Sequence, residues 1–484
     1  MKSILRATAI LGFSSIISVS AGLVTSKVLA VLLGPTGFGF VGLLQNLIAL
    51  CEMVANMGIG VAVVRSGAFA LANRDYAQLT SLRKAAFFLY CISGGSAAAL
   101  LIVFRGEVSY WMLGGAEYSR GVLFLTAAVL FRLASNLQNS FLNAYHQVGV
   151  MARASLLDSL FVSLTYIMAV WLFGFAAVVP MLIAGTAISW MVSRFFLIRE
   201  ITSNPVSPSN RNIKETARSL LAVGAPYTVS LLVGAGVQLL LPALVLHILN
   251  AESVGYYRAA VSISIGYSSL LIASFTKDYY PRVSAVADNP AAIVRIINQQ
   301  QYIVLLFGTP IILVGLAIVP YLVPLLFSSE FLPTTEILEW QLIGDIFKLS
   351  SWTMSYVILV RSRGATFFLT ELFAGAISIL TSWVGIRWFG FSGLGISFLV
   401  TYAVYYVVVW MIVQRDIKLV FTTANKKLLI LAVASSLALR LVSWTVLCDY
   451  RIYIALTLAL LMAAMSFSNL RHELWKMRSA GITS

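Results

Sequence analysis

The chain has 484 residues, of which 60% are hydrophobic and 11% are charged, and its formal net charge is +15. Soluble domains carry about 25% charged residues, so this composition, with a mean hydropathy of +0.91, excludes an ordinary water-soluble domain. The positive charge does not indicate nucleic-acid binding, because the basic residues lie in short segments between apolar runs, as the positive-inside bias predicts.

The apolar runs predict fourteen transmembrane helices, since one helical span needs about 20 apolar residues. In chain order we expect them near residues 10–32, 40–64, 85–104, 122–142, 154–173, 176–196, 219–247, 254–275, 303–326, 337–360, 367–388, 394–413, 428–447 and 452–468. The first run continues to Leu33, which is too long for the apolar part of a signal peptide. We therefore expect it to remain as an uncleaved first span.

The basic residues also predict the orientation of these spans. With the N-terminus in the cytoplasm, most of the 33 basic residues fall in cytoplasmic segments. Examples are Arg65, Arg83, Lys84, Arg199 and Lys214. The even number of spans then places both termini in the cytoplasm.

Short motifs recur 216 residues apart, which indicates an internal duplication. The matching segments are 33–40 with 249–256, 131–135 with 347–351, and 173–175 with 389–391. Each repeat holds six helices, an even number, so both enter the membrane in the same direction. The predicted fold is an all-α polytopic membrane protein with two six-helix bundles, related by a pseudo-twofold axis along the membrane normal, and two extra C-terminal helices.

The same duplication predicts the domain boundaries. The N-terminal six-helix lobe is expected over 1–202 and the C-terminal six-helix lobe over 217–415. Between them, 203–216 reads as a cytoplasmic linker, because it begins with a polar stretch rich in Ser, Asn and Pro. The extra helices and a cytoplasmic tail occupy 416–484, and Arg440 in this part is expected to be structural or to face lipid near an interface.

Two basic residues occupy the same mid-membrane position of the two repeats, Arg132 and Lys348. A charge at this depth costs about 2.5–3.5 kcal/mol on insertion scales, so it usually has a function. The pseudo-symmetry predicts that both face a common cavity, where an Arg fork and a Lys point charge suit a diphosphate. A structural reading stays open, because Glu52 could neutralise Arg132 and Asp345 could neutralise Lys348.

Other residues in the spans are weaker candidates. Lys27 is a third candidate for substrate binding, although it could also snorkel to the outer interface. Glu52 and Asp345 are candidates for coupling transport to protons or sodium ions. Bending of the span near 219–247 is expected at Gly224, Pro226, Gly234 and Gly236, although helix packing alone also enriches glycine in membranes.

The sequence carries no sign of catalytic or cofactor chemistry. It lacks the Gly-rich phosphate loop of ATPases, and its three histidines, His146, His247 and His472, are far apart. We therefore expect no catalytic residue, no metal site and no cofactor.

Three segments resemble O-antigen translocases, which are Wzx-type flippases of the multidrug/oligosaccharidyl-lipid/polysaccharide exporter superfamily. These segments are 33–39, its echo at 249–256, and 344–352 with its Gly-Asp-x-x-Lys element, and the likeness covers roughly residues 1–415. The resemblance implies translocation of an undecaprenyl-diphosphate-linked oligosaccharide, an O-antigen or enterobacterial-common-antigen repeat unit, from the cytoplasmic to the periplasmic leaflet of the bacterial inner membrane. It implies a cationic cavity, no use of ATP, and an O-antigen polymerase and a chain-length regulator as candidate partners.

Other functions remain open on the sequence alone. An ion-coupled multidrug exporter of the same fold would favour organic cations and acidic cavity residues, whereas the duplicated position is basic in both repeats. The two extra helices leave open a closer kinship with lipid II flippases. An O-antigen polymerase or ligase would need a long outer loop with catalytic Arg or His, which the predicted spans leave no room for.

Overall fold

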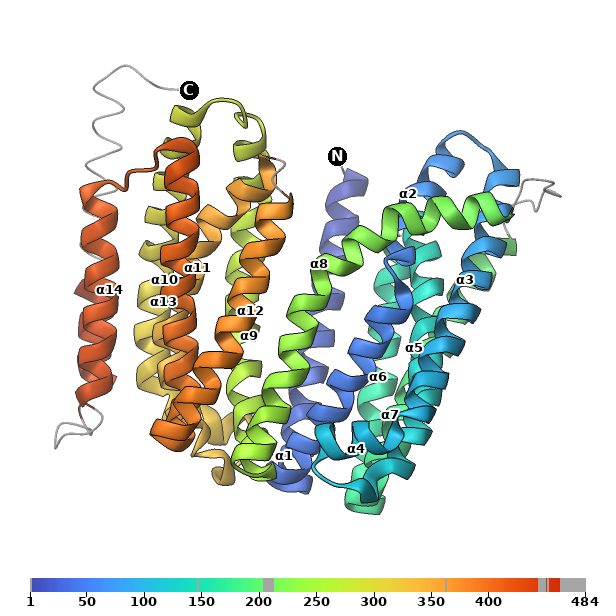
Figure 1. The fold of residues 1–484 in the computed structure, drawn as a ribbon, viewed down its shortest axis with the longest axis horizontal. Coiled ribbons are helices and arrows are strands. Elements are labelled where there is room, and N and C mark those ends of the chain that lie inside the picture. The colour runs from blue at the N-terminus through green and yellow to red at the C-terminus, as the bar shows by residue number, and fades with distance from the viewer. Residues whose placement is uncertain are drawn as a thin grey trace. The chain divides into compact units, whose positions relative to one another are not determined.

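The computed structural model of the chain describes residues 2–145, 148–202, 213–361, 364–442, 450 and 452–461. Throughout these residues the regular structure is helical, as predicted (Figure 1). Contacts within the chain divide it into two compact units. The first unit consists of Met1–Gly255 and Leu326–Ser328, and the second of Tyr256–Leu325 and Ser329–Ser484.

The described residues contain fourteen α-helices and a short helix over 452–461. Those of the first half are α1 (Lys2–Asn56), α2 (Ile59–Ala72), α3 (Tyr76–Val103), α4 (Arg105–Leu113), α5 (Ser119–Ala144), α6 (Val148–Phe173), α7 (Val178–Thr202) and α8 (Ile213–Ile248). They are followed by α9 (Ala251–Ser284), α10 (Pro290–Leu326), α11 (Thr334–Val360), α12 (Gly364–Phe389), α13 (Gly393–Ile417) and α14 (Thr423–Val442).

Eight helical segments of the described chain are long and apolar enough to cross a membrane. Two of them, Gly149–Arg199 and Gly364–Ile417, each contain two of the predicted spans, and Ser14–Asn56 covers most of two more. The all-α polytopic fold is therefore confirmed. Most of the predicted linker, 203–212, and parts of the last two predicted spans, 443–447 and 462–468, lie outside the described residues.

The first two predicted spans meet in one long helix, α1, which is broken at Gly34. Gly34 has a φ of 64°, a left-handed conformation that glycine adopts at little cost, and Pro35 follows it. The second span, expected over 40–64, ends earlier than predicted. Met57 and Gly58 have positive φ angles of 46° and 66°, so α1 ends at Asn56 and α2 begins at Ile59.

Gly224 of α8 packs directly against this second break. A Cβ added to Gly224 would lie 2.5 Å from the backbone oxygen of Met57 and 2.6 Å from the carbonyl carbon of Gly58. Helix backbones approach this closely where side chains are absent. In contrast, a Cβ added at Gly234 or Gly236 would meet nothing within 4 Å. The hinge role of these glycines stays a prediction, and the side chain of Pro226 lies outside the described residues.

The same turn recurs at the same place in the two repeats. Helices α6 and α12 each have 26 residues, and a short 3-10 helix follows each of them, η2 (Gly174–Ala177) and η4 (Gly390–Ser392). Gly174 and Gly390, 216 positions apart, have φ angles of 58° and 56°. Packing also recurs, because α5 lies against α7 in the first unit and α11 lies against α13 in the second. These features support the duplication, while the predicted domain boundaries stay a prediction.

The helix that follows the duplicated part, α14, is joined to α11 within the second unit by a buried ion pair. Arg440 Nε lies 2.8 Å from Glu339 Oε2 of α11, and the two side chains are only 5% and 4% exposed. The guanidinium also lies over the ring of Trp340, 5.5 Å from its centroid. Arg440 therefore has the structural role that was one of the two expectations, and it does not face lipid.

We predict that Gly224→Ala destabilises the protein by about 1–3 kcal/mol, the usual cost of overpacking. The added methyl group would press on the backbone of Met57 and Gly58. The matched control is Gly234→Ala on the same helix, where the methyl group meets open space. Thermal unfolding of the two purified variants in detergent measures the difference, and equal unfolding temperatures would contradict the packing account.

Candidate functional site

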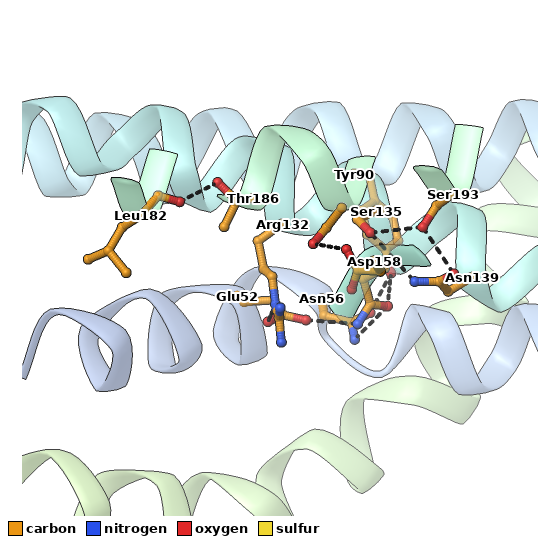
Figure 2. A network of polar contacts seen from close by, with 12 residues as sticks. Glu52, Asn56, Tyr90, Arg132, Ser135, Asn139, Asp158, Leu182, Thr186 and Ser193 are labelled. Atoms are coloured by element: carbon orange, nitrogen blue, oxygen red, sulfur yellow. Dashed lines mark hydrogen bonds and ion pairs between the residues drawn. The ribbon is translucent and has the colours of Figure 1, made fainter. Parts of the chain in front are cut away.

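Arg132 and Glu52 form an ion pair between helices α5 and α1. The Nε atom of Arg132 lies 2.9 Å from Oε2 of Glu52, and Figure 2 shows the two side chains facing each other. The Arg132 side chain is 52% exposed, whereas that of Glu52 is 14% exposed. The guanidinium is therefore held at one edge by its counter-charge and leaves other N–H groups accessible.

The carboxylate of Glu52 is also tied to a polar network inside the first unit. Asn136 Nδ2, one turn after Arg132 on α5, donates to Glu52 Oε1 at 2.8 Å. Tyr90 of α3 donates its hydroxyl to Asn56 Oδ1 at 2.6 Å, and the backbone N–H of Gly60 donates to the same oxygen at 3.1 Å. Asn56 Nδ2 donates to Asn136 Oδ1 at 3.5 Å, so the network joins α1, α2, α3 and α5 beside the ion pair. Figure 2 shows Glu52, Asn56, Tyr90 and Arg132 in this network.

Sequence reasoning did not identify Asn56, Tyr90 or Asn136. A signal was present for two of them, because Asn56 follows Glu52 by four residues and Asn136 follows Arg132 by four residues. Residues four apart share a helix face, so each asparagine lies on the same face as a charged residue. Tyr90 comes from another helix, and no spacing in the sequence connects it to the pair.

Lys348 of α11 is paired in the second unit. Its Nζ lies 3.5 Å from Oδ1 of Asp345 on the same helix, and 3.0 Å from Oγ of Ser268 on α9. The ammonium group also lies 5.8 Å and 5.7 Å from the ring centroids of Phe398 and Tyr402 on α13, within cation–π range. Its side chain is 17% exposed.

Asp345 is fully buried, with a side-chain exposure of 0%. Ser264 donates its hydroxyl to Asp345 Oδ2 at 2.9 Å, and the hydroxyl of Tyr267 donates to the same oxygen. A buried carboxylate is tolerated only where it is paired and hydrogen-bonded, and here α9 and Lys348 supply both. Each of the two cations therefore has the carboxylate partner that the sequence allowed, Glu52 for Arg132 and Asp345 for Lys348.

The two ion sites use equivalent positions of the repeat. Arg132 and Lys348 are 216 residues apart, and their contacts Glu52 and Ser268 are also 216 residues apart. The same two positions therefore touch in both units. In the first unit the contact is a carboxylate on another helix, whereas in the second it is a hydroxyl and the carboxylate lies on the helix of the cation itself.

A cavity of about 760 Å³ opens beside Lys348 within the second unit. Residues of α9 and α11 line it, and their polar members are Ser268, Ser269, Thr276, Lys277, Tyr280, Lys348 and Tyr356. Lys277 gives the cavity a second positive charge, which sequence reasoning did not identify. No Asp or Glu is among the residues that line this cavity. Its chemistry therefore suits an anion.

The third cation candidate, Lys27, is exposed on α1, before the break at Gly34. No group of three or more His, Cys, Asp or Glu side chains that could hold a metal ion occurs among the residues that the structure describes.

A family model and two curated proteins match the sequence of this chain. Residues 28–336 match the family described as "Polysaccharide biosynthesis protein". The lipid III flippase of Escherichia coli (strain K12) is 22% identical over 403 residues, which cover 81% of this chain and 94% of that protein. The lipid III flippase of Shigella flexneri matches to the same extent.

Solved structures of similar fold align with most of this chain and with nearly all of their own length. The lipid II flippase MurJ in an inward closed conformation has a TM-score of 0.72 at 12% identity, and covers 96% of this chain and 99% of that structure. An inward-facing multidrug resistance MATE family transporter of the MOP superfamily has a TM-score of 0.66 at 17% identity, covering 87% and 99%. At these identities the likeness concerns the fold alone.

We predict that the cavity beside Lys348 is open to water. In a variant without the native cysteines, a cysteine replacing Ser269, which is exposed on α9, should react with a membrane-impermeant thiol reagent added to inside-out vesicles. A cysteine replacing Ser264, which is 1% exposed on the same helix, should not react. Mass spectrometry of the labelled protein measures both, and an unreactive cysteine at 269 would argue against a water-filled cavity.

Proposed function

Because this chain belongs to the polysaccharide biosynthesis protein family, we propose that it is a flippase for an undecaprenyl-diphosphate-linked oligosaccharide. The resemblance to Wzx-type flippases noted in the sequence is confirmed at the level of this family. The chain is a multi-pass membrane protein of a transporter family rather than an enzyme. The similarity to lipid III flippases supports a repeat unit of the O-antigen or enterobacterial-common-antigen type as its cargo.

The observation that carries this proposal is the repeated cation. Arg132 and Lys348 occupy equivalent positions, and each contacts the equivalent partner position, Glu52 or Ser268. A diphosphate cannot cross hydrocarbon without counter-charges, and the guanidinium and ammonium groups supply two. The two lysines and the absence of Asp and Glu from the cavity lining in the second unit support the same substrate charge.

The carboxylates of Glu52 and Asp345 compete with the diphosphate for the two cations. With Glu52 and Asp345 ionised, each site is close to neutral, which lowers the cost of keeping the cation in the membrane. Protonation of a carboxylate leaves a net positive site, which binds the diphosphate more strongly. Glu52 and Asp345 are thus the residues through which proton movement would be coupled to substrate binding and release.

The multidrug exporter is the less favoured alternative. Its support is a shared fold at 17% identity, which does not extend to substrates. An exporter of organic cations requires acidic cavity residues, whereas the cavity beside Lys348 is lined by two lysines. ATP-independent expulsion of cationic dyes that depends on this protein would reverse this preference.

The proposed setting is the bacterial inner membrane, with both termini in the cytoplasm and movement from the cytoplasmic to the periplasmic leaflet. The positive-inside distribution of lysine and arginine supports this orientation. The lipid carrier is the proposed binding partner, and an O-antigen polymerase and a chain-length regulator are the candidate protein partners.

We predict that the double variant Arg132→Gln and Lys348→Gln abolishes surface glycan, because neither unit then offers a cation to the diphosphate. Lipid-linked oligosaccharide should accumulate in the cytoplasmic leaflet, as measured by extraction and mass spectrometry. The control is Arg282→Gln, which removes an arginine paired with Asp278 in an exposed i,i+4 bridge on α9. Normal surface glycan in a correctly inserted double variant would remove Arg132 and Lys348 from the substrate site.

We predict that Glu52→Gln strengthens substrate binding. The amide imitates a protonated carboxyl group and keeps an acceptor for Asn136, but it no longer neutralises Arg132. A water-soluble analogue of the diphosphate-linked oligosaccharide should bind this variant more tightly, by about tenfold for each 1.4 kcal/mol gained, while transport slows. Arg132→Gln should instead weaken binding. Unchanged affinity in Glu52→Gln, measured by calorimetry, would contradict the competition between carboxylate and substrate.

A further inference from the structure

A second cavity, of about 630 Å³, lies within the first unit between α3, α5 and α7. Its lining has a basic end and an apolar body. The basic end contains Arg83 of α3 and Arg194 of α7, with Gln138 of α5 beside them. No Asp or Glu is among its lining residues. The proposed site for the diphosphate does not use this cavity.

Two side chains at the basic end, Arg83 and Gln138, have buried polar atoms without hydrogen-bond partners, whereas Arg194 is exposed. Atoms Nε and Nη2 of Arg83 and Oε1 of Gln138 are inaccessible to water, and none of them has a partner in the described structure. The Gln138 side chain is more than nine-tenths buried, since the residue is 8% exposed. The Arg83 guanidinium lies over the ring of Tyr145, 5.6 Å from its centroid, and Nε and Nη2 still lack an acceptor. Arginine stays charged under all ordinary conditions, so these shielded N–H groups favour an anionic acceptor.

The apolar body has the length of one half of a bilayer. Arg83, Phe87, Cys91 and Gly95 line the cavity at four-residue intervals, so they follow one face of α3. At 1.5 Å per residue, this face extends about 18 Å from Arg83 to Gly95. The hydrocarbon of one leaflet is about 15 Å deep, half of the ~30 Å core. Phe87 and Leu130 are 65% and 44% exposed along this opening.

We propose that this cavity binds an anionic glycerophospholipid of the surrounding membrane. The phosphate lies between the Arg83 and Arg194 guanidinium groups, whose planar forks match phosphate oxygens. The Gln138 amide bonds to the glycerol or headgroup, and an acyl chain follows Phe87, Cys91 and Gly95. Basic pockets between transmembrane helices on the cytoplasmic side have this chemistry, and Arg83 is predicted to lie at the cytoplasmic end of its span.

The lipid would contact the polar network that holds Glu52. Tyr90 lines the cavity with its side chain, and its hydroxyl donates to Asn56 Oδ1 in that network. A lipid in the cavity therefore packs against the residue that connects α3 to α1. Through this contact, the lipid composition of the membrane would affect the polar network around Arg132.

Fluorescence of Trp190, which lines the cavity, tests the proposal. Full-length protein in detergent is titrated with brominated phosphatidylglycerol, and the difference between the wild type and Trp190→Phe isolates this residue from the other nine of the ten tryptophans. We expect saturable quenching, at least about tenfold weaker in the double variant Arg83→Gln and Arg194→Gln, because charge-assisted bonds to the phosphate are lost.

Lys84→Gln is the control, since it removes one positive charge from the neighbouring, exposed position of α3. Its titration should equal that of the wild type. Equal quenching by brominated phosphatidylcholine, or an unchanged titration in the double arginine variant, would overturn the proposal. Competition by inorganic phosphate alone would assign the site to free phosphate, and preferential competition by undecaprenyl phosphate would assign it to the carrier; either result overturns the phospholipid assignment.

A second variant tests the apolar body without changing charge. A Cβ added at Gly95 meets nothing within 4 Å, so Gly95→Leu fills the cavity without clashing with the protein. We expect it to reduce lipid quenching of Trp190 as strongly as the loss of the arginines. Gly106→Leu on α4, where a Cβ also meets open space, should have no effect. Undiminished quenching in Gly95→Leu would contradict the placement of the acyl chain.

Discussion

The structure depends on the rule that a charge inside a membrane must have a counter-charge. Arg132 meets Glu52 at 2.9 Å, Lys348 meets Asp345 at 3.5 Å, and Arg440 meets Glu339 at 2.8 Å. The first two pairs are surrounded by hydrogen-bonding side chains, and the Lys348 pair lies beside a cavity, whereas the third is buried against Trp340. The same physical requirement thus produces two ion pairs that we propose as sites for an exchangeable anion, and one fixed connection between helices.

The helices and the duplication could be predicted from the sequence, because long apolar runs indicate membrane helices and recurring short motifs indicate the repeat. The equivalence of positions 132 and 348 followed from the repeat. The contact of Arg132 with Glu52 and that of Lys348 with Ser268 agree with it. The Phe-Gly-Phe turns were also recognisable, since Gly174 and Gly390 have nearly the same left-handed φ. Periodicity and repetition therefore predict the helices and the paired basic positions.

Tertiary contacts were less accessible. The end of α1 at Asn56 was missed because the apolar run continues through Met57 and Gly58, and the contact of this break with Gly224 is not visible in the sequence. Tyr90 and Lys277 were missed because their roles depend on neighbouring helices rather than on spacing. Arg440 was left between two roles, since its partner Glu339 lies about a hundred residues earlier in the chain. Partners brought together by folding carry no local signal.

The position of each carboxylate makes the two halves mechanically different. Glu52 reaches Arg132 from another helix, so any sliding of α1 against α5 stretches that attraction and exposes an uncompensated positive charge. Asp345 is on α11 with Lys348 and moves wherever the lysine moves. The ion pair of the first unit therefore depends on the position of one helix against another, whereas that of the second unit lies within one helix.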